Sequence, residues 1–225
     1  MTVEVNTRTS FDPRVYFVTD EQLCGPRGVL ETTRRVVAGG ATAVQLRAKD
    51  APAAHTFELL LRLAEVCSGR ATLIVNDRVD VFLAARAAGA EVGGVHVGQD
   101  DLPIALVREL VGPQAVVGLT ANTPAHLAAA TALPPGTVDY LGVGVIRPTS
   151  TKADHPEALG TTGFADFAAM SVLPCVAIGG IRLEDVAALR RAGGTGVAVV
   201  SALCAAPDPE RAARAFREEW DRAGS

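Results

Sequence analysis

Five short clusters of polar residues follow five apolar, β-branched runs of this sequence, each at the point where the run ends. The clusters occupy positions 45–49, 76–77, 99–101, 149–152 and 179–180. Their cationic members are Arg47, Lys49 and Lys152, and their candidate metal-binding acids are Asp77 and Asp101. Mg²⁺ binds oxygen ligands, commonly one or two carboxylates together with substrate phosphates. Three cations with two acids therefore suggest a site for a magnesium-bound pyrophosphate.

The elements that must position these clusters form a repeating pattern. Extended apolar runs cover residues 15–20, 43–49, 72–77, 94–98, 116–120, 139–144, 175–180 and 196–202. Segments of helical composition lie between them, most clearly at 53–68 and 207–223. Prolines, which are tolerated in the first helical turn, mark helix starts at Pro52, Pro103, Pro124 and Pro209. Strands that alternate with helices pair in parallel through right-handed crossovers.

We predict an α/β fold, a single (β/α)8 TIM barrel, with an open doubly wound sheet as the alternative. A length of 225 residues suits one domain, with residues 13–223 in the barrel and 1–12 as an N-terminal extension. A doubly wound sheet binds ligands at one switch point and often carries Gly-x-Gly-x-x-Gly after its first strand. That motif does not follow residues 15–20. The clusters come from many strand ends, which meet at one mouth in a barrel.

The composition excludes several classes of protein. A formal net charge of −4 and a pI near 5.6 argue against a broad nucleic-acid interface, which needs a basic patch. No apolar run approaches the ~18 residues of a membrane span, and residues 1–10 lack the apolar core of a signal peptide. We therefore expect a cytoplasmic protein without nucleic-acid or membrane partners. Its widely separated cysteines are expected to be reduced and mostly buried.

The first cluster carries the clearest functional signal. Gln45, Arg47 and Lys49 alternate along one predicted strand, so their side chains should share a face. Two cations that point into a barrel are not ordinary core, because unpaired buried charge costs several kcal/mol. An anion-binding role is favoured over a structural ion pair.

The acidic residues of these clusters have two interpretations, helix capping and metal binding. Asn76 and Asp77 end one predicted strand and Asp100 and Asp101 follow another, each just before a predicted helix. Residues of these types often cap helix N-termini. Capping and metal binding are about equally supported for the first pair, and in the second pair one acid can cap while the other binds metal.

The later turns resemble phosphate-binding turns. The connection over residues 147–160 is long, which favours a functional loop over a solvated turn. Gly179-Gly180 and Val200-Ser201 close the last two predicted strands, where barrels often hold phosphate on backbone amides. His96 lies on an apolar run and is predicted to be a hydrogen-bonded core residue rather than a catalyst.

The motifs, taken in order, resemble those of thiamine phosphate synthase over residues 15–220. They are Gln45-Leu46-Arg47-x-Lys49, Asn76-Asp77, Gly94-Val95-His96-Val97-Gly98-Gln99-x-Asp101, Gly142-x-Gly144-x-x-x-Pro148-Thr149-x-Thr151-Lys152 and Ile178-Gly179-Gly180-Ile181. The resemblance implies a transferase that joins 4-amino-2-methyl-5-hydroxymethylpyrimidine pyrophosphate to 4-methyl-5-(2-phosphoethyl)thiazole, giving thiamine phosphate and pyrophosphate. Magnesium and the cations would stabilise the departing pyrophosphate before the thiazole nitrogen attacks. Both a monomer and a homo-oligomer are compatible with the sequence.

The resemblance also assigns the site residues. Those that would hold the pyrimidine pyrophosphate are Gln45, Arg47, Lys49, Asn76, Thr120 and Lys152, with Arg47, Lys49 and Lys152 as the catalytic cations. Those of the thiazole-phosphate pocket are Thr149, Thr151, Gly180, Val200 and Ser201. Asp77 and Asp101 would bind Mg²⁺, and Asp100 would not.

Three positions depart from the family pattern. Val145 replaces a usual proline, Arg147 a usual aromatic residue, and Thr120 a usual serine. Two other functions share the barrel: the related thiazole tautomerase, and a non-catalytic phosphate-ligand sensor. The tautomerase lacks most of the pyrophosphate and metal residues found here and has a histidine after the fifth strand, where this chain has residues 120–123. A phosphate-binding isomerase would need an acid/base pair, and we find none.

Overall fold

Eight parallel strands close into a barrel in the computed structural model, which describes residues 11–148 and 157–224. Neighbours in sequence are neighbours in the sheet, and β1 pairs with β8 to complete the circle. The strands are β1 (Val15–Val18), β2 (Ala43–Leu46), β3 (Thr72–Asn76), β4 (Gly94–Val97), β5 (Val116–Thr120), β6 (Tyr140–Val143), β7 (Cys175–Ile178) and β8 (Gly196–Val199). The predicted (β/α)8 barrel is confirmed.

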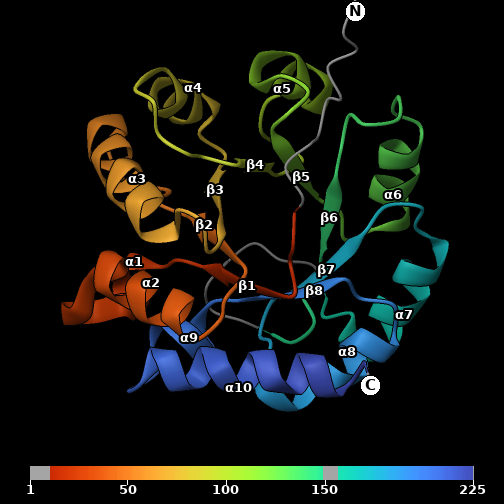
Figure 1. Cartoon of the computed structure of the whole chain (residues 1–225). Coiled ribbons are helices and arrows are strands. Elements are labelled where there is room, and N and C mark those ends of the chain that lie inside the picture. Colours follow the sequence, from red (N-terminus) through yellow and green to blue (C-terminus); the bar gives the residue numbers. More distant parts are fainter. Residues whose placement is uncertain (1–10, 149–156, 225) are drawn as a thin grey trace, which may run out of the picture.

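Helices surround the strands on the outside (Figure 1). They are α1 (Glu21–Cys24), α2 (Gly28–Ala38), α3 (Ala53–Cys67), α4 (Val79–Ala87), α5 (Ile104–Val111), α6 (Pro124–Thr131), α7 (Gly160–Met170), α8 (Val186–Arg191), α9 (Ser201–Cys204) and α10 (Pro209–Arg222), with short 3₁₀ turns η1 (Gly25–Arg27) and η2 (Leu183–Asp185). The last helix, α10, packs against both α2 and α8 and so completes the ring. Among the described residues, no helix is long and apolar enough to span a membrane.

The predicted helix starts are confirmed to within one residue. Pro124 and Pro209 are the first residues of α6 and α10, and Pro52 and Pro103 occupy the positions before α3 and α5. Asp208 caps α10, since its side chain accepts a hydrogen bond from the Arg211 amide. Local sequence signals therefore mark these four helix starts.

The strands end earlier than the apolar runs predict. β2 ends at Leu46, so the prediction that Arg47 and Lys49 continue its alternation is wrong. The physical reason lies in its neighbour: β1 ends at Val18, and the Arg47 amide donates to the Thr19 hydroxyl at 2.9 Å instead of continuing the ladder. Similarly, β8 ends at Val199 and the chain turns at once into α9.

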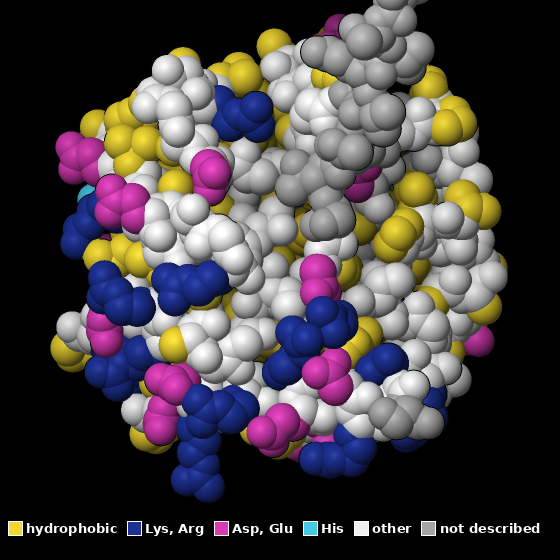
Figure 2. All heavy atoms as spheres, viewed as in Figure 1, with side chains coloured by type: hydrophobic (Ala, Val, Ile, Leu, Met, Phe, Trp, Pro, Cys, Tyr) yellow, Lys and Arg dark blue, Asp and Glu magenta, His cyan; other side chains and the backbone are white. Residues whose placement is uncertain are grey.

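Apolar side chains fill two regions, one between strands and helices and one inside the barrel. The inner region contains two fully buried tyrosines, Tyr16 and Tyr140, and Phe11 stacks on Tyr140 with ring centroids 4.6 Å apart. All four cysteines are buried and free, as predicted. On the face shown in Figure 2, basic side chains lie beside acidic ones instead of forming a broad basic area.

Candidate active site

The carboxyl ends of the strands bring the predicted residues to one end of the barrel, which we call the mouth. Gln45 lies in β2, Asn76 ends β3 and Thr120 ends β5. Directly beyond their strands lie Asp77 after β3, Asp101 in the turn after β4, Gly180 after β7, and Val200 and Ser201 after β8. Three other predicted site residues, Thr149, Thr151 and Lys152, lie outside the described residues.

Two carboxyl groups meet at the mouth, from Asp77 and Asp101. Burial raises the pKa of Asp77, and with the hydrogen bond and negative charge of Asp101 the pKa reaches about 6, although the Lys49 charge and the Asn76 amide lower it in part. Asn76 Nδ2 donates to Asp77 Oδ2 at 2.5 Å, and the Gly98 amide donates to Asp101 Oδ2 at 2.7 Å. Both carboxylates are thus held in place, while the charge of Asp101 opposes the ionisation of Asp77. Such a pair favours a shared proton or a bound cation.

Helix capping does not explain these acids. The residue before α4 is Arg78 and the residue before α5 is Pro103, and neither helix has a side-chain cap. The capping reading is therefore wrong for Asp77, Asp100 and Asp101. The structure also places Asp77 in the left-handed backbone region, with a φ of 60°, which few residues other than glycine, asparagine and aspartate adopt readily.

The donor set suits a hard divalent cation such as Mg²⁺. Two carboxylates lie together, and the described part of the chain contains no group of three or more His, Cys, Asp and Glu side chains of the kind that encloses a metal. Mg²⁺ typically takes one or two carboxylates and completes its shell with waters and substrate phosphates.

Affinity for Mg²⁺ should fall as the pH is lowered through about 6, because protons compete for Asp77. Between about pH 7 and about pH 5 the ionised fraction of such a group drops roughly tenfold, and the apparent association constant should drop by a similar factor. Isothermal titration calorimetry of Mg²⁺ into the protein measures this association constant. Asp101→Asn should shift the midpoint to lower pH, whereas Asp100→Asn should leave it in place. An association constant that does not change over this range would refute the assignment.

Two cations follow β2 in the sequence. Arg47 is half-buried, and its Nη1 lies 3.6 Å from Asp20 Oδ2, while Asp20 also caps α1 through the Leu23 amide. Lys49 is exposed, and its charge acts on Asp77. The Arg47–Asp20 contact orients the guanidinium beside the start of α1. Lys49 is placed for an anionic ligand at the acid pair.

The glycines after β7 are required by close packing. Gly179 and Gly180 have φ values of 93° and 68°, and a Cβ on Gly180 would lie 2.7 Å from the Arg147 Cβ. The Arg147 amide in turn donates to the Gly179 carbonyl at 2.9 Å. Glycine is therefore needed here because the segment after β6 lies directly against the turn. This contact supports the turn as a shaped part of the mouth.

Arg147 is tied to a partner that the sequence analysis missed. Its Nε and Nη2 donate to the Asp185 carboxylate at 3.0 and 2.5 Å, and the Arg182 amide donates to the same group at 2.9 Å. Burial alone would raise the pKa of Asp185, but these hydrogen bonds outweigh it and the pKa falls below the usual value. The ion pair fastens the start of the long loop to η2. No motif marks Asp185, since the contact joins residues far apart in sequence.

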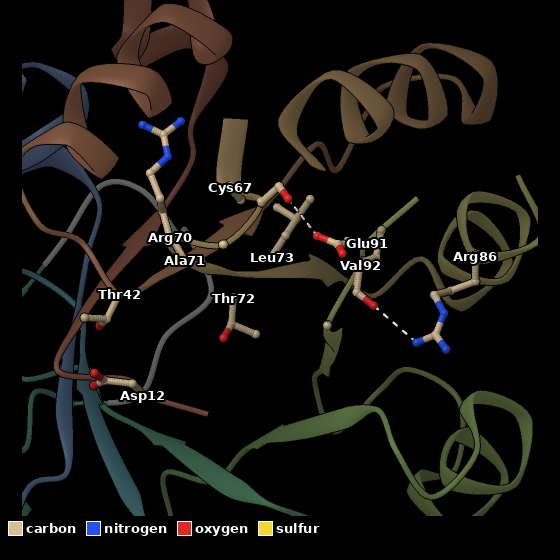
Figure 3. A pocket seen from close by; sticks show the side chains of 13 residues that line it. Asp12, Thr42, Cys67, Arg70, Ala71, Thr72, Leu73, Arg86, Glu91 and Val92 are labelled. Atoms are coloured by element: carbon tan, nitrogen blue, oxygen red, sulfur yellow. Dashed lines mark hydrogen bonds between the residues drawn. The ribbon is translucent and has the colours of Figure 1, made fainter. Parts of the chain in front are cut away.

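A cavity of about 770 Å³ lies at the other end of the barrel. Figure 3 shows residues that precede β2, β3 and β4 around it, including Thr42, Arg70 and Val92. Its arginines serve the backbone, because Arg70 donates to the Val66 carbonyl and Arg86 to the Val92 carbonyl. None of the predicted site residues lines it. The cavity is not the candidate site.

A closed barrel whose carboxyl mouth gathers cations, paired acids and glycine turns is the architecture of barrel enzymes that act on small phosphorylated molecules. Residues 15–203 match the model of the thiamine monophosphate synthase family. The chain belongs to this family.

Individual relatives agree with this membership. The chain is 46% identical over 208 residues to the thiamine-phosphate synthase of Azorhizobium caulinodans, which covers 92% of this chain and 94% of the relative. It is 47% identical over 205 residues to that of Laribacter hongkongensis, covering 90% and 93%. Among solved structures, thiamine phosphate pyrophosphorylase from Pyrococcus furiosus superposes with a TM-score of 0.82 at 30% identity, covering 95% of this chain and 98% of the other.

Proposed function

We propose that this enzyme joins 4-amino-2-methyl-5-hydroxymethylpyrimidine pyrophosphate to 4-methyl-5-(2-phosphoethyl)thiazole and releases pyrophosphate. The observation that carries the proposal is the Asp77–Asp101 pair with Lys49 beside it at the mouth. A barrel that only bound a phosphate would need cations but not two opposed carboxylates. Paired acids next to cations suit a pyrophosphate that arrives and leaves with a divalent cation. The family membership and the names of the relatives support the same reaction.

The pyrimidine half of the site is proposed to lie over β2, β3 and β5. Arg47 and Lys49 bind the pyrophosphate oxygens, and Lys152 is proposed as a third cation from the long loop. Asn76, which already orients Asp77, lies beside them. Gln45 and Thr120 contact the pyrimidine ring. Placing the cations where charge develops on the leaving pyrophosphate lowers the barrier to its departure.

The thiazole phosphate is proposed to lie at the ends of β7 and β8. Gly180 and Val200 offer backbone groups close to the mouth, and Ser201, which is exposed, adds a hydroxyl. Thr149 and Thr151 are proposed to close the same pocket. The thiazole nitrogen attacks the pyrimidine methylene carbon and has no proton to lose, so the protein has to position two rings and needs no general base.

Asp77 and Asp101 are proposed to hold Mg²⁺. When bound, the ion supplies positive charge against the pyrophosphate oxygens. A cytoplasmic location is also proposed, supported by four buried and free thiols.

The function is tested by incubating the purified protein with Mg²⁺, the pyrimidine pyrophosphate and the thiazole phosphate. We expect thiamine phosphate and pyrophosphate in equal amounts, and no product when EDTA is present. Liquid chromatography measures the first product, and a coupled phosphate assay measures the second. Interconversion of thiazole tautomers without coupling would instead identify a tautomerase. Tight phosphate-ligand binding with neither activity would identify a sensor.

A further inference from the structure

Five side chains inside the barrel form one line of hydrogen bonds, which we call the buried polar chain. Gln45 Nε2 donates to the Tyr16 hydroxyl at 2.8 Å, and the Tyr16 and Tyr140 hydroxyls lie 2.9 Å apart. Tyr140 Oη lies 3.0 Å from His96 Nδ1, and His96 Nε2 lies 3.0 Å from Thr120 Oγ1. The buried polar chain crosses the barrel from Gln45 on β2 to Thr120 on β5. Its two ends are the residues proposed to contact the pyrimidine ring.

The surrounding backbone is shaped to hold this chain. His96, Gly118 and Tyr140 are register neighbours on β4, β5 and β6. A Cβ on Gly118 would lie 2.2 Å from Tyr140 Cζ and 2.4 Å from His96 Nδ1. A Cβ on Gly142 would lie 3.0 Å from His96 Cε1. Two glycines thus make the space in which the imidazole and the phenol meet, so the contact is a built feature of the interior.

The donor in each hydrogen bond of the buried polar chain follows from Gln45 Nε2. Gln45 Nε2 can only donate, so the Tyr16 proton must go to Tyr140, its other hydroxyl partner among the described residues. The Tyr140 proton must then go to His96 Nδ1, since any other arrangement leaves a buried hydroxyl without an acceptor. His96 therefore accepts at Nδ1 and donates from Nε2 to Thr120.

Burial supports this pattern. Tyr16 and Tyr140 are 1% exposed, and burial raises the pKa of both phenols well above the usual value, so both keep their protons. Gln45 is 4% exposed, and the described residues provide no hydrogen bond to its Oε1. That oxygen is therefore available to a ligand. Thr120 Oγ1 accepts from His96, so its own proton is available to a ligand as well.

We propose that the buried polar chain selects the pyrimidine ring. It presents an acceptor at Gln45 Oε1 on one side of the mouth and a donor at the Thr120 hydroxyl on the other. A 4-aminopyrimidine complements this pair, because its amino group donates and its ring nitrogens accept. A 4-oxo analogue places an acceptor oxygen against the Gln45 oxygen. The proposal rests on the function proposed above, and it makes Tyr16, Tyr140 and His96 positioning residues that act through Gln45 and Thr120.

Competition between the pyrophosphate esters of the 4-amino and 4-oxo pyrimidines tests the proposal. The unaltered protein should couple the amino substrate with a kcat/KM about 10²-fold or more above that of the oxo analogue, because a site that loses a designed hydrogen bond discriminates strongly. Tyr140→Phe and His96→Gln each keep side-chain volume but cut the chain, so each end can reverse its polarity. We expect both variants to lower the amino-over-oxo ratio about tenfold or more.

Phe11→Leu is the matched control. Phe11 stacks on Tyr140 but contributes no hydrogen bond, so this variant should lose thermal stability and keep the substrate ratio. An unchanged ratio in Tyr140→Phe and His96→Gln, with coupling intact, would overturn the buried polar chain while leaving the proposed function standing. An unaltered protein that couples both substrates equally would also overturn it. An unaltered protein that couples neither would overturn the proposed function and this inference together.

Discussion

Asp77→Asn and Asp101→Asn are each expected to lower turnover by roughly 10²-fold or more, the scale of losing one electrostatic catalytic element. Each variant removes one carboxylate from the proposed cation site and keeps a side chain of the same shape. Asparagine is preferable to alanine at position 77, because asparagine tolerates the φ of 60° found there. Rates at saturating substrate, over a range of Mg²⁺ concentrations, measure the loss.

The thermal stability of Asp77→Asn and Asp101→Asn should not fall as their turnover does. Burial and the charge of Asp101 oppose ionisation of Asp77, so above about pH 6 either substitution relieves repulsion in the metal-free protein. Thermal unfolding without metal should therefore be unchanged or shifted upward. Asp100→Asn is the neighbouring control: Asp100 is exposed, and this variant should retain most of its turnover. If Asp100→Asn proves the damaging change and Asp101→Asn the tolerated one, the ligand assignment is wrong.

The sequence predicts the barrel because the signals for its strands and its helices are local. An apolar run and a proline at a helix start are each visible within a few residues, as Pro124 and Pro209 show for the helices. Strand ends are less predictable, since they depend on the neighbouring strand. Arg47 leaves the sheet because its amide finds the Thr19 hydroxyl, a contact made across 28 positions.

Contacts between residues distant in sequence also limit what can be predicted of the candidate site. Asp77 and Asp101 could be predicted as a pair because each follows an apolar run, and runs of this kind end at one mouth. Tyr16 and Tyr140 are 124 positions apart, and nothing local indicates that their hydroxyls meet. Their inward positions, together with glycines on neighbouring strands, become informative only once the register is known. The same is true of Asp185, which meets Arg147 across 38 positions.

Arg108→Met is expected to lower the free energy of unfolding by about 3 kcal/mol, the scale of removing one member of a largely buried ion pair. Arg108 Nη2 lies 2.5 Å from Asp139 Oδ2, and the two side chains are 13% and 16% exposed. The same guanidinium donates to the carbonyls of Gly112 at 2.9 Å, Ala115 at 2.7 Å and Thr137 at 3.2 Å. Its loss removes the cation from a largely buried carboxylate and the donor from three carbonyls together. For a chain of this size the melting temperature should fall by about 6–12 °C.

The position of Arg108 predicts that Arg108→Met loses stability and keeps its kcat. Its partners precede β5 and β6, so the network lies at the amino ends of the strands, away from the mouth. At a temperature well below unfolding, Arg108→Met should therefore keep its kcat within about twofold, since charges at this end of a barrel serve stability. Arg34→Met is the control: Arg34 pairs with Glu31 but is 53% exposed, and its loss should change stability by less than about 0.5 kcal/mol. Urea denaturation and steady-state rates on the same preparations separate the two effects. A large fall in kcat with unchanged stability would contradict this division of the barrel into a catalytic end and a stabilising end.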